Sequence, residues 1–180
     1  SEAFAALRAD GSVVTWGSAT YGGDSSAVAA RLDGTIAVTQ LFASGGAFAA
    51  LRADGSLVVW GAAWYGGDGP ADPTQVDGTI DVVQVFSTGS AFGALRADGS
   101  LVTWGDASSG ADSSGVAAQL DGTIDVTQVF ATHGAFAALR ADGSLVTWGS
   151  ATAGGDSSSV AAQLDGTIDI RRVLSTDGAF

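Results

Sequence analysis

The chain has 180 residues and a formal net charge of −12, and it contains no Cys, no Met and a single His, His133. This composition excludes disulfides, thiol chemistry and zinc sites built from Cys or from several His side chains. No apolar run approaches the roughly 18 residues that a membrane-spanning helix needs, so no membrane span is expected.

Aromatic residues recur at a constant spacing along the sequence. Two series have members 44 residues apart: Phe4, Phe48, Phe92, Phe136 and Phe180, and Trp16, Trp60, Trp104 and Trp148. Such a register predicts a repeat protein in which each unit is one supersecondary block. We therefore expect a single repeat domain over residues 1–180, with units at 4–47, 48–91, 92–135 and 136–179. The similarity of the units suits a recently duplicated natural array or a designed symmetric protein.

The first predicted element is a β-hairpin over residues 3–17. Its arms, AFAALR and SVVTWG, are rich in apolar and β-branched residues and flank Ala9-Asp10-Gly11. Asp-Gly between two apolar runs is typical of a tight turn, because Asp bonds to its own backbone and Gly accepts positive φ. Apolar side chains lie on both faces of the arms, which predicts a sheet covered on both sides.

A Gly- and Ser-rich segment at 17–34 follows, which we call the strap. Its second half, with Val28 and Leu32 in alternation, fits either a short outer strand or a turn of helix. In unit two the strap carries Pro70 and Pro73, which cannot donate to a β-ladder and therefore limit it to an edge or an irregular segment.

The unit closes with GTIAVTQLFAS at 34–44, where alternation predicts a third strand. Three strands and a weak fourth in 44 residues have the length of a propeller blade of the WD-repeat size class. The sequence thus predicts an all-β, β-propeller-like fold with four 44-residue blades of three to four antiparallel strands. Helical solenoids are excluded by the period of two and by the Asp-Gly turns, whereas a stacked β-solenoid stays as an alternative.

The segment VTQLFASGGAFAALRADGSLVVWG at 38–61 resembles the repeat of the regulator of chromosome condensation family and the blades of the bacterial β-lactamase-inhibitor propellers. The shared features are an apolar strand, a Gly-rich link, the ALxxDGxVxxWG hairpin and a Gly-rich loop after Trp-Gly, and all four units carry them. The resemblance implies a ring of blades with binding loops on its faces. It implies no activity, because family members range from nucleotide-exchange factors to enzyme inhibitors.

The sequence departs from that family in two respects. The family usually closes seven blades, whereas four units are present here. The His that often precedes the hairpin strand is replaced at four positions: Ala3, Ala47, Ala91 and Ala135.

The hairpin at 3–17 has no strand before it, and a predicted strand at 168–175 has no hairpin after it. We expect closure by strand complementation, either within one chain or between two chains as half of an eight-bladed dimeric ring. Repeated head-to-tail pairing through these segments would instead give a fibre.

Most of the negative charge comes from Asp residues that recur with the repeat: Asp10, Asp54, Asp98 and Asp142; Asp24, Asp68, Asp112 and Asp156; Asp33, Asp77, Asp121 and Asp165. An acidic surface repels phosphate backbones, so no nucleic-acid partner is expected. It also favours an extracellular or cell-surface location. Asp-rich loops supply ligands for calcium, but these lack the period of known calcium repeats, so we interpret them as turn caps and expect no metal or cofactor.

The candidate residues fall into two groups. Eight aromatic residues are expected as core wedges between blades: Trp16, Trp60, Trp104 and Trp148, with Phe4, Phe48, Phe92 and Phe136. Trp64 breaks the repeat pattern, and together with Tyr65 and the equivalent Tyr21 it marks the predicted binding surface.

His133 has no partner set by spacing and is interpreted as a solvated loop residue. Four Arg residues are expected to pair with the nearby Asp: Arg8, Arg52, Arg96 and Arg140.

These features predict a non-catalytic propeller scaffold or recognition module that binds a protein or glycan through its face loops. Enzyme activity is not expected, because the Asp residues recur alike in every unit, whereas an active site singles some out. A glycan-binding lectin and a self-assembling fibre unit are the alternatives.

Overall fold

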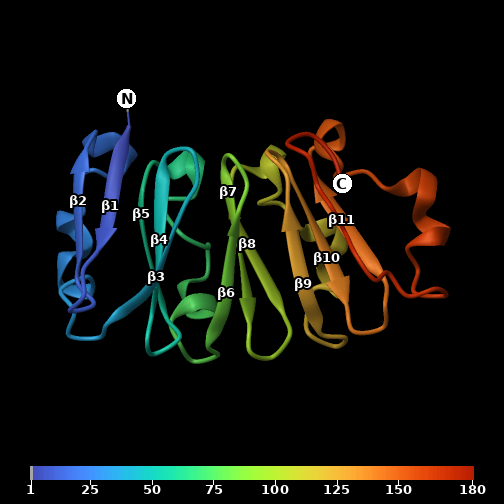
Figure 1. The fold of residues 1–180 in the computed structure, drawn as a ribbon, viewed down its shortest axis with the longest axis horizontal. Helices are drawn as coiled ribbons and strands as arrows, with labels where there is room; N and C mark the ends of the chain where they lie inside the picture. The colour runs from blue at the N-terminus through green and yellow to red at the C-terminus, as the bar shows by residue number, and fades with distance from the viewer. Residues whose placement is uncertain (1) are drawn as a thin grey trace.

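The computed structural model describes residues 2–180 and shows an all-β protein with short 3₁₀ segments between its strands (Figure 1). The strands are β1 (Ala3–Leu7), β2 (Val13–Gly17), β3 (Val38–Ala43), β4 (Ala47–Arg52), β5 (Leu57–Gly61), β6 (Val82–Ser87), β7 (Ala91–Arg96), β8 (Leu101–Gly105), β9 (Val126–Ala131), β10 (Ala135–Arg140) and β11 (Leu145–Gly149). No helix within residues 2–180 is long and apolar enough to cross a membrane.

The strands form separate antiparallel sheets of consecutive strands, which we call blades I to IV: β1–β2, β3–β4–β5, β6–β7–β8 and β9–β10–β11. Figure 1 shows them side by side in chain order, from the blue N-terminal hairpin to the red C-terminal segment. Antiparallel sheets of consecutive strands are the form of propeller blades and differ from the parallel coils of a β-solenoid.

Every blade contains the hairpin that the Asp-Gly turn predicts. In blade I, Phe4 pairs with Trp16 across the strands. The turn is fixed by Asp10 Oδ1, which accepts hydrogen bonds from the backbone N–H of Ser12 at 3.0 Å and from its hydroxyl at 2.6 Å. Gly11 has a φ of 79°, which favours glycine. The same acceptor role recurs in the other three blades at Asp54, Asp98 and Asp142.

The strap folds into two 3₁₀ segments in each unit. The first segments are η1 (Ala19–Tyr21), η3 (Ala63–Tyr65), η5 (Ala107–Ser109) and η7 (Ala151–Ala153), and the second are η2 (Ser26–Arg31), η4 (Pro73–Val76), η6 (Ser114–Gln119) and η8 (Ser158–Gln163). The weak fourth strand of the predicted blade is therefore wrong, and the helical alternative is right. In η4, Pro73 takes the first helical position and Asp72 accepts from the N–H of Thr74 at 3.0 Å.

Successive blades pack face to face, and the strap of one unit covers the last strand of the next. η1 and η2 lie against β5, η3 lies against β8, and η5 and η6 lie against β11. At each of these junctions a Trp indole Nε1 donates to a strap carbonyl 38 residues earlier: Trp60 to Gly22 at 3.0 Å, Trp104 to Gly66 at 3.0 Å and Trp148 to Gly110 at 2.9 Å. Apolar burial and one repeated hydrogen bond thus hold each junction.

The four blades do not close into a ring within one chain. Blade I has two strands, and residues 168–175, predicted as a strand, form none. Blade I and the C-terminal segment lie at opposite ends of the row (Figure 1), and β1 pairs with β2 alone. This corrects the expected closure within one chain, while the two-chain ring and the fibre stay predictions.

Candidate binding surface

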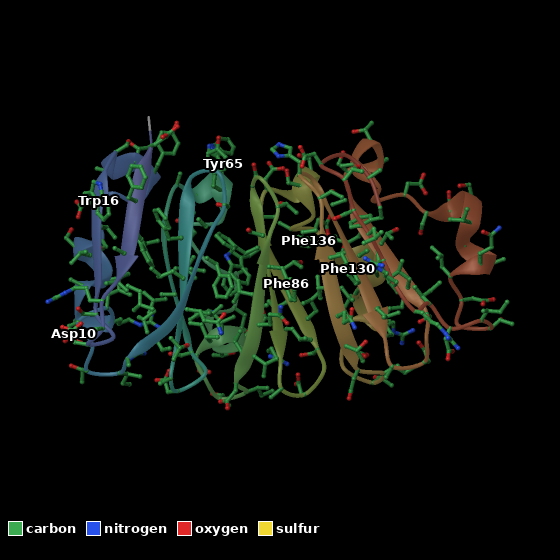
Figure 2. All side chains as sticks on the ribbon, viewed as in Figure 1. Asp10, Trp16, Tyr65, Phe86, Phe130 and Phe136 are labelled. Carbon is green, nitrogen blue, oxygen red and sulfur yellow. The ribbon has the colours of Figure 1, made fainter. Side chains whose placement is uncertain are left out.

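The row of blades has two edges of different chemistry. The Asp-Gly turns form one, the turn edge. The links between the first and second strands of blades II to IV, together with η1, η3, η5 and η7, form the other, the link edge. Figure 2 shows Asp10 on the turn edge and Tyr65 on the link edge. The predicted binding residues all belong to the link edge or its 3₁₀ segments.

The links of neighbouring blades are joined by backbone hydrogen bonds. The N–H of Gly45 donates to the carbonyl of Gly89 at 2.8 Å, that of Gly89 donates to His133 at 2.8 Å, and that of His133 donates to Asp177 at 2.9 Å. One bond therefore joins blades II and III, one joins blades III and IV, and one joins blade IV to the C-terminal segment. The links form a regular platform whose spacing is set by the main chain.

Hydroxyl side chains anchor the 3₁₀ segments to this platform. Ser44 Oγ donates to the carbonyl of Tyr65 at 2.7 Å. Thr88 and Thr132 make the equivalent bonds to Ser109 at 3.0 Å and Ala153 at 2.9 Å. Because these carbonyls belong to the last residues of η3, η5 and η7, each hydroxyl fixes the end of one 3₁₀ segment.

Tyr21 and Tyr65 meet over the first link. Their ring centroids are 6.1 Å apart at an interplanar angle of 65°, an edge-to-face arrangement. Both rings cover Gly46: a Cβ there would lie 2.6 Å from Tyr65 Cδ2 and 2.7 Å from Tyr21 Cδ1. Glycine at this position is what allows two tyrosines from different units to pack together.

Trp64 lies beside this pair in sequence but is not packed into it, since its side chain is 70% exposed. The two tyrosines are partly buried and pack against each other, whereas the indole beside them is largely exposed. The structure thus brings Tyr21 and Tyr65 together and leaves Trp64 exposed next to them.

His133 is exposed and belongs to the link edge, as its loop position implied. Its ring covers the neighbouring link, because a Cβ on Gly89 would lie 2.5 Å from His133 Cε1. Sequence spacing gave no indication of this contact, since it depends on the bonds between links. The imidazole therefore continues the aromatic covering of the platform beyond Tyr65.

The turn edge carries the predicted Arg–Asp pairs. The N···O distances are 3.6 Å for Arg8–Asp10, 3.6 Å for Arg52–Asp54, 2.9 Å for Arg96–Asp98 and 3.3 Å for Arg140–Asp142. Hydrogen bonds from the Ser144 side chain and backbone hold the pKa of Asp142 below its ordinary value. These carboxylates are occupied by turn bonds, which fits their role as caps.

Asp residues of the straps also cap turns. Asp24 accepts from the N–H of Ser26 at 2.9 Å, and Asp33 accepts from that of Thr35 at 2.8 Å. Within residues 2–180 no group of three or more His, Asp or Glu side chains is placed to hold a metal ion.

The burial of the aromatic residues predicted for the core differs from blade to blade. Every hairpin stacks its Phe on its Trp, with centroids 5.3–5.6 Å apart. In blades II to IV the tryptophans are buried, as are Phe92 and Phe136, and Phe48 is partly buried. In blade I, by contrast, Phe4 and Trp16 are about half exposed.

No protein-family model and no curated protein matches the sequence. Solved structures do match the fold. Prp20p from Saccharomyces cerevisiae is 19% identical with a TM-score of 0.56 over 82% of this chain and 42% of its own. Human WBSCR16 is 20% identical, with a TM-score of 0.52 over 99% and 50% of the two chains. The CRINKLY WD40 ectodomain of the Arabidopsis thaliana receptor kinase ACR4 is 17% identical, with a TM-score of 0.50 over 94% and 58%.

This chain spans between 42% and 58% of the length of those three solved chains. At such identities the likeness concerns the fold alone. Together with the four antiparallel sheets and their face-to-face packing, it shows that the chain has a β-propeller-type architecture.

Proposed function

We propose that the protein is a non-catalytic propeller scaffold that binds a partner protein through the link edge. The observation that carries the proposal is the aromatic surface formed by Tyr21, Trp64 and Tyr65 on a platform of hydrogen-bonded links. Propeller neighbours support the class of function, since Prp20p is described with its binding to Gsp1p and histones and in complex with Kap60.

The physical reason is that the three side chains offer apolar area with polar tips on a preorganised backbone. A partner would bury Trp64 fully and meet the two tyrosine hydroxyls at its rim. The turn edge offers no equivalent, because its carboxylates and guanidinium groups are paired with each other.

The test compares wild-type protein with the Y21A/W64A/Y65A variant as baits in a cell extract, followed by purification and titration of each captured protein. A control variant, V83A, removes an apolar side chain that is half exposed on β6. We expect the triple variant to lose at least tenfold in affinity and V83A to bind as wild type. Equal affinity of all three baits for every purified partner would reject the proposal.

The exposed indole of Trp64 also favours the second candidate, a glycan-binding lectin, because an exposed aromatic ring can stack on the apolar face of a sugar. A glycan array probed with wild-type protein and with W64A separates the two. Glycan binding that depends on Trp64, in the absence of a protein partner, would favour the lectin.

A further inference from the structure

One face of the blade I hairpin is an apolar patch, which we call the hairpin face. Phe4, Val14 and Trp16 are 53%, 45% and 51% exposed, and Ala6 lies opposite Val14 in the pairing register. The residues 88 positions later in blade III, Phe92, Val102 and Trp104, are buried at a blade junction. The hairpin face is therefore a junction surface that no blade covers within residues 2–180.

The far end of the row carries a matching groove of about 360 Å³, the C-terminal groove. Its apolar lining includes Leu145, Leu164, Ile170, Val173 and Phe180. The residues 44 positions earlier are Leu101, Leu120, Val126, Val129 and Phe136, which form the buried core between blades III and IV. The groove thus has the composition of one half of a blade junction.

The groove also presents the acceptor that each internal junction uses. Gly154 follows η7 with φ of 95°, as Gly110 follows η5 with φ of 99°. The carbonyl of Gly110 accepts from the indole of Trp148, whereas residues 155–180 contain no Trp to reach Gly154. The hairpin face carries the one repeat tryptophan, Trp16, that lies outside a junction.

Residues 170–177 are already held in the position of a first blade strand. The N–H of Ile170 donates to the carbonyl of Gly143 at 3.2 Å, as that of Val126 does to Gly99 at 2.9 Å. Ser175 Oγ reaches the carbonyl of Ala131 at 3.4 Å, as Ser87 Oγ reaches that of Ala43 at 2.9 Å. What this segment lacks is the second strand of its sheet.

We propose that the C-terminal groove binds the β1–β2 hairpin of a second copy of this chain. The hairpin would pair with residues 170–175 and complete a three-stranded blade across two copies. The register follows from blade IV, where Phe136 pairs with Ala131 and Ala138 with Val129. It places Phe4 of the second copy opposite Ser175, and Ala6 opposite Val173. Trp16 would donate to the carbonyl of Gly154.

Docking requires Phe180 to move. Its ring covers Gly154, where an added Cβ would lie 2.8 Å from Phe180 Cδ2, just as Phe136 covers Gly110 at 2.7 Å. Phe180 therefore occupies the place that Phe4 of the second copy would take, and one ring must leave. F180A should strengthen association, and unchanged or weaker association would reject this displacement.

The first test is the solution mass by analytical ultracentrifugation over a concentration series. We expect the weight-average mass to rise above the 17.7 kDa of one chain, in a closed or an open-ended form. A constant 17.7 kDa up to about 100 μM, a hundredfold above a micromolar Kd, would overturn the proposal. The Y21A/W64A/Y65A variant should associate as wild type, which separates this proposal from the link-edge proposal.

Complementary variants sharpen the test. F4D places a charge on the hairpin face, and V173D places one in the groove, so each alone should stay at the mass of a single chain. A mixture of the two retains one intact hairpin face and one intact groove, and it should form a dimer and nothing larger. V83D, on β6 outside both surfaces, should associate as wild type. Association of F4D or V173D alone at wild-type strength would overturn the proposal.

The proposed pairing register between the two copies can be tested by disulfide cross-linking, because the chain has no native Cys. An A6C variant mixed with a V173C variant should form an intermolecular disulfide on mild oxidation, since paired residues in antiparallel strands lie within disulfide reach. A mixture of A6C with I168C, five residues away from that register, should not. Equal cross-linking in both mixtures would overturn the proposed pairing, and the readout does not depend on either variant changing stability.

Discussion

Blades I and III contain nearly the same hairpin in different surroundings. Phe4 stacks on Trp16 with centroids 5.3 Å apart, and Phe92 stacks on Trp104 at 5.5 Å. Yet Phe92 is fully buried and Trp104 is 4% exposed, whereas the blade I pair is half exposed. The local sequence thus determines the hairpin and its aromatic stack, but burial comes from the neighbouring blade. The aromatic pair of blade III is covered by blade II and its strap, so each blade depends on its neighbour for its core, as in other repeat proteins.

The largest expected effect is that of truncating the buried ring. W104A should destabilise the protein by about 3–5 kcal/mol, because it leaves a cavity at the junction and removes the donor to Gly66. W16A should cost about 1 kcal/mol or less, since half of its ring contacts solvent. Urea unfolding of both variants at micromolar protein concentration measures the difference. Equal losses would show that the two hairpins share one environment.

The next largest loss of stability is expected at Gly66, the glycine against which the ring of Phe92 packs. Gly66 has φ of 90°, and an added Cβ would lie 2.8 Å from Phe92 Cδ2, so G66A should cost about 1–3 kcal/mol through strain and a clash. Gly115, in η6, has nothing within 4 Å of such a Cβ. Thermal unfolding of G66A and of the control G115A tests this, and a similar midpoint for both would contradict it.

A smaller effect is expected to be the same in both hairpins. Ser12 and Ser100 each donate to the turn carboxylate from the backbone N–H and from the hydroxyl. S12A and S100A should therefore each cost about 1 kcal/mol, the net value of a typical intramolecular hydrogen bond. Denaturant midpoints measure both. A much larger loss for S100A would show that the covering blade, and not the turn itself, sets the strength of this bond.

The features of the fold that depend on residues close together in the chain, or on the repeat, can be predicted from the sequence. The Asp-Gly turns, the three strands, the Arg–Asp pairs and the aromatic series follow from local pattern and from the spacing of 44. The 3₁₀ form of the straps does not follow, because alternation of Val28 and Leu32 fits a strand as well as a helical turn.

The candidate surface is only partly visible in the sequence. Trp64 and Tyr65 stand out because they break the repeat, and Tyr21 follows by equivalence. The platform beneath them depends on backbone bonds between links, and no side-chain pattern encodes those bonds. The recurring hydroxyl at Ser44 and Thr88 was the one available signal. The exposure of Phe4 and Trp16 could not be predicted either, because the hairpin of blade I has nearly the same sequence as hairpins whose aromatic rings are buried.

The smallest expected effect per residue is the pH dependence of the turn edge. Hydrogen bonds from the Ser12 side chain and backbone lower the pKa of Asp10 below its ordinary value of 3.8, and those from Ser144 lower that of Asp142 in the same way. A lowered folded-state pKa means that the unfolded chain binds more protons in this range, so the stabilisation is present above pH 3.8 and is lost as pH falls through the folded-state pKa values.

The free energy of unfolding should therefore decline as the pH is lowered below about 4, and D10N and D142N should each flatten the decline slightly. Urea titrations between neutral pH and pH 2 measure the slope. Because Asp10 belongs to the exposed hairpin and Asp142 to a packed one, similar flattening by both variants would show that turn chemistry is independent of blade packing. Flattening by D142N alone would instead mean that the hairpin of blade I opens at its turn when no blade covers it.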